Sequence, residues 1–111
     1  MKINFFETPI FNRLAKRLGK KYKSFQIDFD NFLNSISQQT PNNLGNNVFK
    51  YRFAIKSKNK GKSGGLRIIT FEVIVNSDEK NITLLTIYDK SEQDSISKKE
   101  INEILNEISK K

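Results

Sequence analysis

The chain has 111 residues and a formal net charge of +8, from 20 Lys and Arg against 12 Asp and Glu. It contains no Cys and no His, which excludes disulfides and thiolate metal sites and removes the commonest acid–base catalyst. We therefore expect one cytoplasmic domain with no metal, no cofactor and no membrane contact, whose partner is an anion such as nucleic acid. No apolar run is long enough for a signal peptide or a membrane span.

The N-terminal third predicts a strand followed by two helices. Residues 2–6 have the composition of a short strand, and Thr8 followed by Pro9 is typical of a helix start. Apolar residues then recur at helical spacing, and Gly19 is the expected end of the first helix. A second helix is expected from Ser24 to no further than residue 40, before Pro41, with an apolar stripe of Phe25, Phe29, Phe32, Leu33 and Ile36.

A basic cluster lies along the first helix, where no acidic residue occurs between Glu7 and Asp28. A solvated helix face explains this cluster at least as well as contact with nucleic acid does. Its members are Arg13, Lys16, Arg17, Lys20, Lys21 and Lys23.

The densest charge lies in residues 48–71, which hold seven cations and no acid. After a loop at 41–47, a strand is expected over 48–55. There Lys50, Arg52 and Lys56 alternate with apolar residues, so the cations share one face. A flexible loop with Lys58, Lys60 and Lys62 follows. It is not a nucleotide P-loop, because Lys56 stands where the first glycine is required. The arrangement favours a groove that binds a polyanion.

The C-terminal half predicts two more strands and a helix. Residues 66–75 are apolar on both faces, which is typical of a central buried strand, and 82–88 form the next strand after a polar turn at 76–81. Ser97 and Glu100 form a capping box for a last helix. The expected fold is α+β, in the order β-α-α-β-β-β-α, with a small antiparallel sheet packed against an N-terminal helical hairpin and a C-terminal helix.

These segments resemble the RelE/ParE superfamily of bacterial type II toxins, and within it the HigB branch of RelE-like messenger-RNA interferases. The loop GKxGGxR at 61–67 is the strongest single element. The segments on which the resemblance rests are T-P-x-F at 8–11, L-x-K-x-Y at 18–22, FKYRFAI at 49–55, GKSGGLRIITF at 61–71 and LLTIYDKSEQDSIS at 84–97.

The resemblance implies a RelE-like fold and a ribosome-dependent endoribonuclease that cuts messenger RNA in the ribosomal A site. Its partners would be a cognate antitoxin protein, the ribosome and messenger RNA. Operator DNA would be bound only through the toxin–antitoxin complex.

Metal-free RNA cleavage needs a base for the ribose 2′-OH, cations for the phosphorane charge and an acid for the leaving oxygen. By resemblance, Arg67 would clamp the scissile phosphate and Lys90 would be the second catalytic cation. Lys50 and Arg52 match paired basic positions and are candidates for the base and for contact with the substrate strand. Tyr88, two residues before Lys90, does not match the family's C-terminal tyrosine in position; it would stack on a base or orient the 2′-OH. The candidates for RNA or ribosome contact are Lys56, Lys58, Lys60 and Lys62.

Two other functions remain open from the sequence. A ParE-like member of the superfamily would inhibit DNA gyrase and cleave nothing, although such members generally lack this set of cations. A decayed toxin would bind nucleic acid through salt-dependent phosphate contacts without turnover. Each cation also has an ordinary interpretation as a solvated residue of a sheet face.

Overall fold

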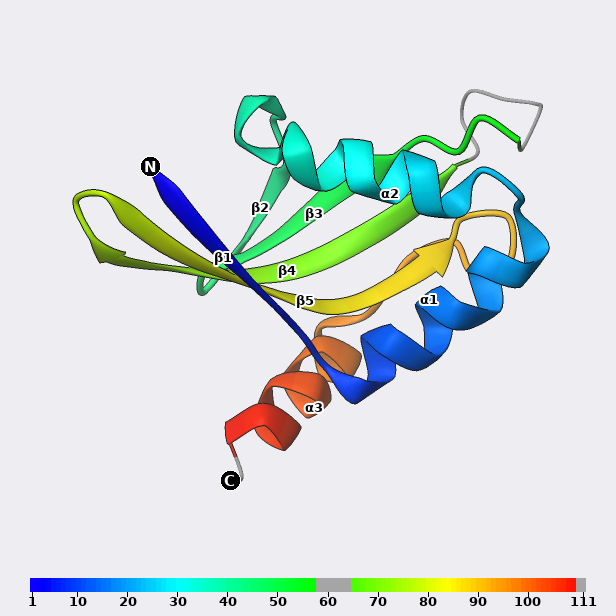
Figure 1. Ribbon diagram of the computed structural model, residues 1–111. Helices are drawn as coiled ribbons and strands as arrows, with labels where there is room; N and C mark the ends of the chain where they lie inside the picture. The colour runs from blue at the N-terminus through cyan, green and yellow to red at the C-terminus, as the bar shows by residue number, and fades with distance from the viewer. Residues whose placement is uncertain (58–64, 110–111) are drawn as a thin grey trace.

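A twisted five-stranded sheet forms the centre of the part of the chain that the computed structural model describes, residues 1–57 and 65–109 (Figure 1). The strand order across the sheet is β1-β5-β4-β3-β2. The strands are β1 (Lys2–Glu7), β2 (Asn42–Gly45), β3 (Val48–Phe53), β4 (Leu66–Asn76) and β5 (Glu79–Asp89). Strands β3 to β5 pair antiparallel as expected, and β2 adds a further antiparallel strand beside β3. By contrast, β1 pairs parallel with β5 at one edge. The α+β fold class and its RelE-like order are confirmed.

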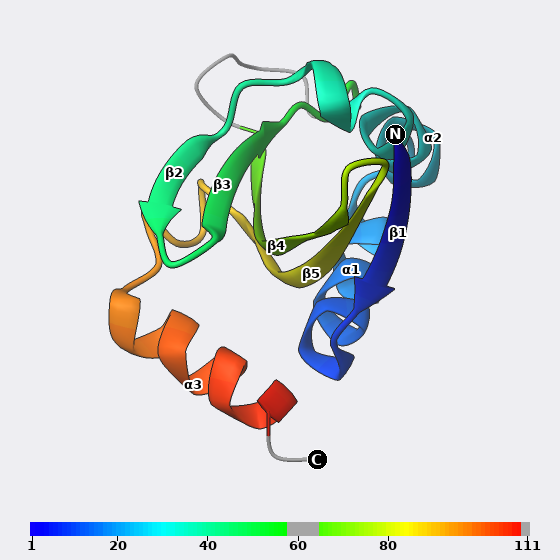
Figure 2. The ribbon, with the colours of Figure 1, turned by 90° about the vertical axis from the view of Figure 1, so that its left-hand side faces the viewer.

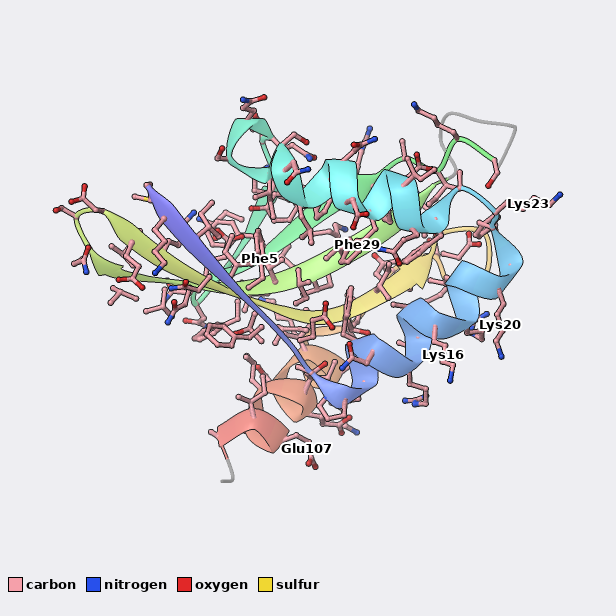
Figure 3. The ribbon with its side chains drawn as sticks, viewed as in Figure 1. Phe5, Lys16, Lys20, Lys23, Phe29 and Glu107 are labelled. Carbon is pink, nitrogen blue, oxygen red and sulfur yellow. The ribbon has the colours of Figure 1, made fainter. Side chains whose placement is uncertain are left out.

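The two N-terminal helices cover one face of the sheet. They are α1 (Pro9–Lys21) and α2 (Phe25–Asn34), and a short 3-10 turn, η1 (Ile36–Gln38), follows. Phe25, Phe29 and Phe32 of α2 pack against Tyr51 and Phe53 of β3, with ring centroids 5.3–6.0 Å apart. Figure 3 shows Phe29 pointing from α2 toward the sheet. The predicted aromatic stripe is therefore core.

The start of α1 is confirmed, and its predicted end is wrong. The backbone N–H of Phe11 donates to Thr8 Oγ1 at 2.9 Å, which is the expected N-terminal cap. Gly19 lies inside the helix, which continues to Lys21 and is capped by the N–H of Tyr22 on Leu18 O. A Cβ at Gly19 would lie 3.7 Å from the Phe25 ring, so this residue sits where the two helices pass close together.

The C-terminal helix covers the other face of the sheet. Helix α3 (Lys98–Ser109) begins with the predicted capping box, because Glu100 N–H donates to Ser97 Oγ at 3.1 Å and Ser97 N–H donates to Glu100 Oε1 at 3.3 Å. Its Ile101 and Ile104 are buried in a second core that includes Ile69 of β4. Figure 2 shows α3 on the opposite side of the sheet from α2.

Residues 41–47, predicted to be a loop, contain the edge strand β2 and its hairpin turn. Asn46 and Asn47 have φ of +54° and +67°, the pair of positive values that a two-residue type I′ hairpin turn requires. Asn tolerates this backbone, so these residues return the chain directly into β3. The sheet thereby gains a strand beside the cations of β3.

Strand β4 is central as predicted, but only its first half is buried. Leu66 to Thr70 are buried on both faces, whereas Val73, Ile74 and Val75 are 38%, 61% and 49% exposed. The turn that follows is shorter than predicted, because β5 already begins at Glu79. The β4–β5 hairpin therefore extends past the part of the sheet that the helices cover (Figure 1).

No helix in the described ranges is both long and apolar enough to cross a membrane.

Candidate active site

The five residues predicted to be catalytic line one pocket of about 130 Å³. It lies on the α3 face of the sheet, where the cations of β3 and β4 meet the end of β5. The lining residues are Asn42, Lys50, Arg52, Arg67, Tyr88, Lys90 and Asp94. Four side chains in this small volume carry positive charge, and one, Asp94, carries negative charge.

Strand register explains why these residues meet. Arg52 of β3 pairs with Arg67 of β4, and Arg67 pairs in turn with Tyr88 of β5. Residues that face each other across paired strands project from the same face of a sheet. Arg52, Arg67 and Tyr88 therefore form one row across three strands. Lys50 pairs with Asn42 across the β2–β3 hairpin and lies two residues away from that row.

A β-bulge in β5 places Tyr88 in this row. The β4–β5 pairing changes register between Ile69 opposite Thr86 and Thr70 opposite Leu84, which leaves Leu85 as the extra residue. An extra residue moves every later side chain of the strand to the other face. Without the bulge, Tyr88 would be opposite Leu66 on the α1–α2 face. The bulge therefore aligns Tyr88 with Arg67.

Arg67 is buried, with 9% of its surface exposed, and its Nη1 donates to the carbonyl of Leu66 at 3.2 Å. The residue before β4, Gly65, has φ of +71°, and a Cβ there would lie 3.2 Å from the carbonyl oxygen of Phe53 and 3.9 Å from Arg67 Nη1. Glycine at this position lets the chain pass close to the end of β3 just before β4 begins, two residues before Arg67.

Tyr88 is 5% exposed, and its hydroxyl oxygen is buried without a hydrogen-bond partner among the described residues. Burial raises the pKa of this hydroxyl, the positive charge of Arg67 lowers it, and Asp94 raises it, with a net upward direction. The hydroxyl therefore stays protonated at neutral pH and is available as a donor. A buried hydroxyl without a partner costs about 1–3 kcal/mol, which a bound acceptor would offset.

Lys90 and Asp94 form the outer edge of the pocket. Lys90 Nζ lies 4.0 Å from Asp94 Oδ1, and the Asp94 side chain is 95% exposed, so the two groups remain hydrated. The backbone N–H of Lys90 donates to Gly65 O at 3.2 Å. This bond holds the residue after β5 next to the residue before β4.

Asp89, between Tyr88 and Lys90, anchors that corner. Its carboxylate is fully buried and accepts from the hydroxyl of Tyr22, from Ser91 N–H at 2.9 Å and from Ser91 Oγ at 2.7 Å. Lys21 Nζ lies 3.4 Å away. The end of α1 thus fixes the turn that carries Lys90.

The predicted RNA contacts outside the pocket divide into two groups. Lys56 is exposed and does not line the pocket; its backbone N–H donates to the buried carboxylate of Asp28 at 2.9 Å. Lys58, Lys60 and Lys62 lie outside the described residues. Arg52 is exposed and Lys50 is half-buried, so both present charge at the mouth of the pocket.

Two pocket residues, Asn42 and Asp94, were not expected from the sequence. Asn42 lies in the segment taken to be a loop, and the Asn46-Asn47 pair before a strand was the signal of a hairpin that would place it beside Lys50. Asp94 lies in the connector to α3. Only the direction of that connector brings it to Lys90, so no local pattern pointed to it.

The basic cluster of α1 is partly neutralised. Glu92 accepts from Lys21 Nζ at 2.7 Å and from Arg17 Nη2 at 3.1 Å, which lowers the pKa of Glu92. Figure 3 shows Lys16, Lys20 and Lys23 pointing away from the body of the protein. The interpretation as a solvated helix face fits these positions.

The pocket suits an anion with a compact charge, such as a phosphate group. Arg67 and Lys90 offer cationic donors beside the neutral donor of Tyr88, and donors held in place by a sheet stabilise developing negative charge without reorganisation. Within the described residues, no three His, Cys, Asp or Glu side chains are grouped so that they could hold a metal ion.

Comparison with known proteins gives one family. A family model described as the RelE toxin of the RelE / RelB toxin–antitoxin system matches residues 3–111. No curated protein matches the chain.

Proposed function

The chain belongs to the RelE toxin family of toxin–antitoxin systems, and from this membership we propose that it is an endoribonuclease that cleaves messenger RNA in the ribosomal A site. One observation carries the proposal: the five residues chosen for this reaction from the sequence line one pocket. They come from three strands and from the turn after β5. RelE toxins are generally endoribonucleases. A pocket with four cations beside a buried tyrosine hydroxyl suits their substrate.

In the proposed reaction the ribose 2′-oxygen attacks the adjacent phosphorus, and the bond from phosphorus to the 5′-oxygen breaks. The products are a 2′,3′-cyclic phosphate and a 5′-hydroxyl. Arg67 clamps the phosphate and neutralises the phosphorane, because a guanidinium donates two parallel hydrogen bonds to phosphate oxygens. Lys50 first releases its ammonium proton to solvent and then, as the neutral amine, accepts the 2′-OH proton. Arg52 contacts the substrate strand.

Lys90 and Tyr88 act at the other side of the phosphate. Lys90, half-buried at the edge of the pocket, donates to the leaving 5′-oxygen. Tyr88, which remains protonated, donates to a phosphate oxygen. Its buried ring favours this role over stacking on a base.

The remaining assignments belong to the same proposal. The chain acts in the cytoplasm as one domain of the HigB-like branch, is inhibited by its antitoxin, and binds operator DNA only in complex with it. The lysines at 56, 58, 60 and 62 contact ribosomal or messenger RNA.

Primer extension on a defined messenger tests the proposal, with the protein added to programmed ribosomes or to the messenger alone. We expect cuts at A-site codons only when ribosomes are present. Cuts on free RNA would remove the ribosome from the mechanism. No cuts in either reaction would contradict the nuclease, and a gyrase supercoiling assay would then test the ParE-like function.

Arg67→Ala separates catalysis from binding. We expect cleavage to fall by about 100-fold or more, the scale for losing a group that stabilises developing charge, while ribosome binding changes little. A loss of binding with an unchanged cleavage rate at saturation would contradict a catalytic role for Arg67 and assign it to binding alone.

A further inference from the structure

An open groove of about 560 Å³ lies between α1 and α3, next to the cation pocket. Both helices flank β5, which forms its floor. Ile10 and Leu14 of α1 face Ile96 and Ile104 across the groove, so its interior is apolar. A volume in the range of ~300–1,000 Å³ is typical of sites that take side chains or small ligands.

The charge of this groove is opposite to that of the protein. Five of the chain's 12 acidic residues line it, against Arg17 as the single lining cation within the described residues. The acidic residues are Asp89, Glu92, Glu100, Glu103 and Glu107. Asp89 and Glu92 are already paired with Lys21 and Arg17, so the net negative charge of the groove comes from the three Glu residues of α3. These disfavour nucleic acid and favour a cationic occupant.

The acids of α3 are available to such an occupant. Glu100, Glu103 and Glu107 are spaced three and four residues apart, which places them in one stripe along the helix. Glu103 and Glu107 form no ion pair with any described residue and are exposed. Like charges at this spacing destabilise a helix, so a basic partner would stabilise α3.

We infer that the groove docks an amphipathic helix of a protein partner, whose apolar stripe is flanked by Lys or Arg. An extended peptide could pair with residues 85–89, the part of β5 that β1 does not reach, but its alternating side chains would not follow the acidic stripe of α3. A helix needs only apolar side chains at i, i+3, i+4 and i+7, with cations that follow the acidic stripe of α3.

The groove is continuous with the candidate active site through Tyr88, which lines both. A docked helix would contact the buried tyrosine from the side away from Arg52. This inference goes beyond the proposed function and does not depend on it, because docking can be measured without any cleavage.

NMR titration of the ¹⁵N-labelled protein tests the inference. The probe is a synthetic amphipathic peptide of about 16 residues, above the length at which isolated helices become marginal in water, with Leu at the i, i+3, i+4 and i+7 positions and Lys elsewhere. The control peptide has Glu in place of Lys. We expect saturable shifts at Ile10, Leu14, Ile104 and Glu107 with the Lys peptide and none with the Glu peptide.

Charge reversal in the groove identifies the acidic stripe as the cause. We expect Glu103→Lys with Glu107→Lys to weaken binding by roughly tenfold or more, because two attractive charge contacts become repulsive. Asp30→Lys with Asp78→Lys makes the same change in net charge on exposed acids outside the groove and should weaken binding less. Glu103→Gln with Glu107→Gln serves as the milder variant if the reversal unfolds α3.

Several outcomes would overturn the inference: no saturable binding, equal binding of the Glu peptide, shifts located outside the groove, or equal weakening by both reversals. Shifts at Ile10 and Ile104 that depend on protein concentration without peptide would assign the groove to a second copy of the chain and would also overturn it. Ribosomal cleavage by the Glu103 and Glu107 variants is expected to match that of the unmodified protein.

Discussion

At the scale of single residues, two buried tyrosines on opposite faces of the sheet show different chemistry. The Tyr51 hydroxyl donates to Glu72 Oε2 at 2.6 Å, and that carboxylate also accepts from Thr70 and Lys80. Burial and the bond to Glu72 raise the pKa of Tyr51 well above its ordinary value. Tyr88 has no such partner among the described residues. The first hydroxyl stabilises the fold, and we expect the second to serve a ligand.

Substitution of each tyrosine by phenylalanine tests this division. We expect Tyr88→Phe to raise the free energy of unfolding by about 1–3 kcal/mol, because an unpaired buried hydroxyl is removed. Cleavage should fall by about 100-fold, as for the loss of one donor to a developing charge. Urea unfolding and the single-turnover cleavage rate on ribosomes measure the two effects.

Tyr51→Phe is the matched control. It should lower the free energy of unfolding by about 1.5–3 kcal/mol, the range for hydrogen bonds to charged groups, while the folded protein cleaves at the original rate. Full activity of Tyr88→Phe would show that its hydroxyl has no part in the reaction.

At the scale of elements, the short connections around the pocket position the reactive groups. Gly65 leads into β4, and its carbonyl accepts the N–H of Lys90 beyond the end of β5. The 89–93 turn is held by the end of α1 through Tyr22 and Lys21. Strands supply the row of side chains, and these connections set the positions of its ends.

Gly65→Ala should disturb both stability and catalysis. Positive φ disfavours a Cβ, and the added atom would lie 3.2 Å from Phe53 O, so we expect a loss of about 1–3 kcal/mol in the free energy of unfolding. The cleavage rate should fall by more than the loss of folded protein alone explains, because the hydrogen bond from Lys90 N–H to the Gly65 carbonyl is displaced. Gly45→Ala is the control, since its φ of +91° carries strain but no atom lies within 4 Å. An equal effect of the two substitutions on cleavage would contradict the positioning role of Gly65.

Glu92→Gln tests the contact between α1 and the 89–93 turn by its pH dependence. Hydrogen bonds from Lys21 and then Arg17 lower the pKa of Glu92 in the folded protein. A lowered carboxyl pKa stabilises the fold above the pKa of the unfolded chain, and this contribution disappears as the pH falls through the folded value. The unmodified protein should therefore be slightly more stable than Glu92→Gln at pH 7, and the difference should vanish in acid and shrink in high salt. A difference that grows in acid would contradict this account.

At the scale of the whole molecule, charge is separated between two sites on the α3 face. The cation pocket gathers residues of β3, β4 and β5 with Lys90, and the groove beside it gathers the acids of α3 and the 89–93 turn. The net charge of +8 therefore describes neither site. The pocket suits a phosphate backbone, and the groove suits a basic protein segment.

The salt dependence of RNA binding tests which cations meet the phosphates. For single strands, log Kd changes with log salt by about 0.7 per neutralised phosphate, so Lys50→Gln with Arg52→Gln should reduce the slope by roughly 1–1.5. Lys16→Gln with Lys20→Gln removes the same charge from the exposed side of α1 and should leave the slope almost unchanged. A larger loss of slope in the α1 variant would place RNA on the basic cluster instead.

Local patterns in the sequence determined most of the elements and the cations of the site. The Thr8-Pro9 start, the Ser97–Glu100 capping box and the alternation around Lys50 and Arg52 act over a few residues, so they were predictable. The RelE resemblance, found from the same segments, gave four of the residues that meet in the pocket, and Tyr88 was added from its place two residues before Lys90.

Tertiary structure alone decided how these parts combine. The bulge at Leu85 turns Tyr88 to the Arg67 face, and Glu92 neutralises Arg17 and Lys21 across more than 70 residues of sequence. The stripe of acids on α3 becomes one wall of a groove only because α3 and α1 both flank β5. Strand register and long-range charge contacts depend on how distant segments pack, and no short window of sequence contains that information.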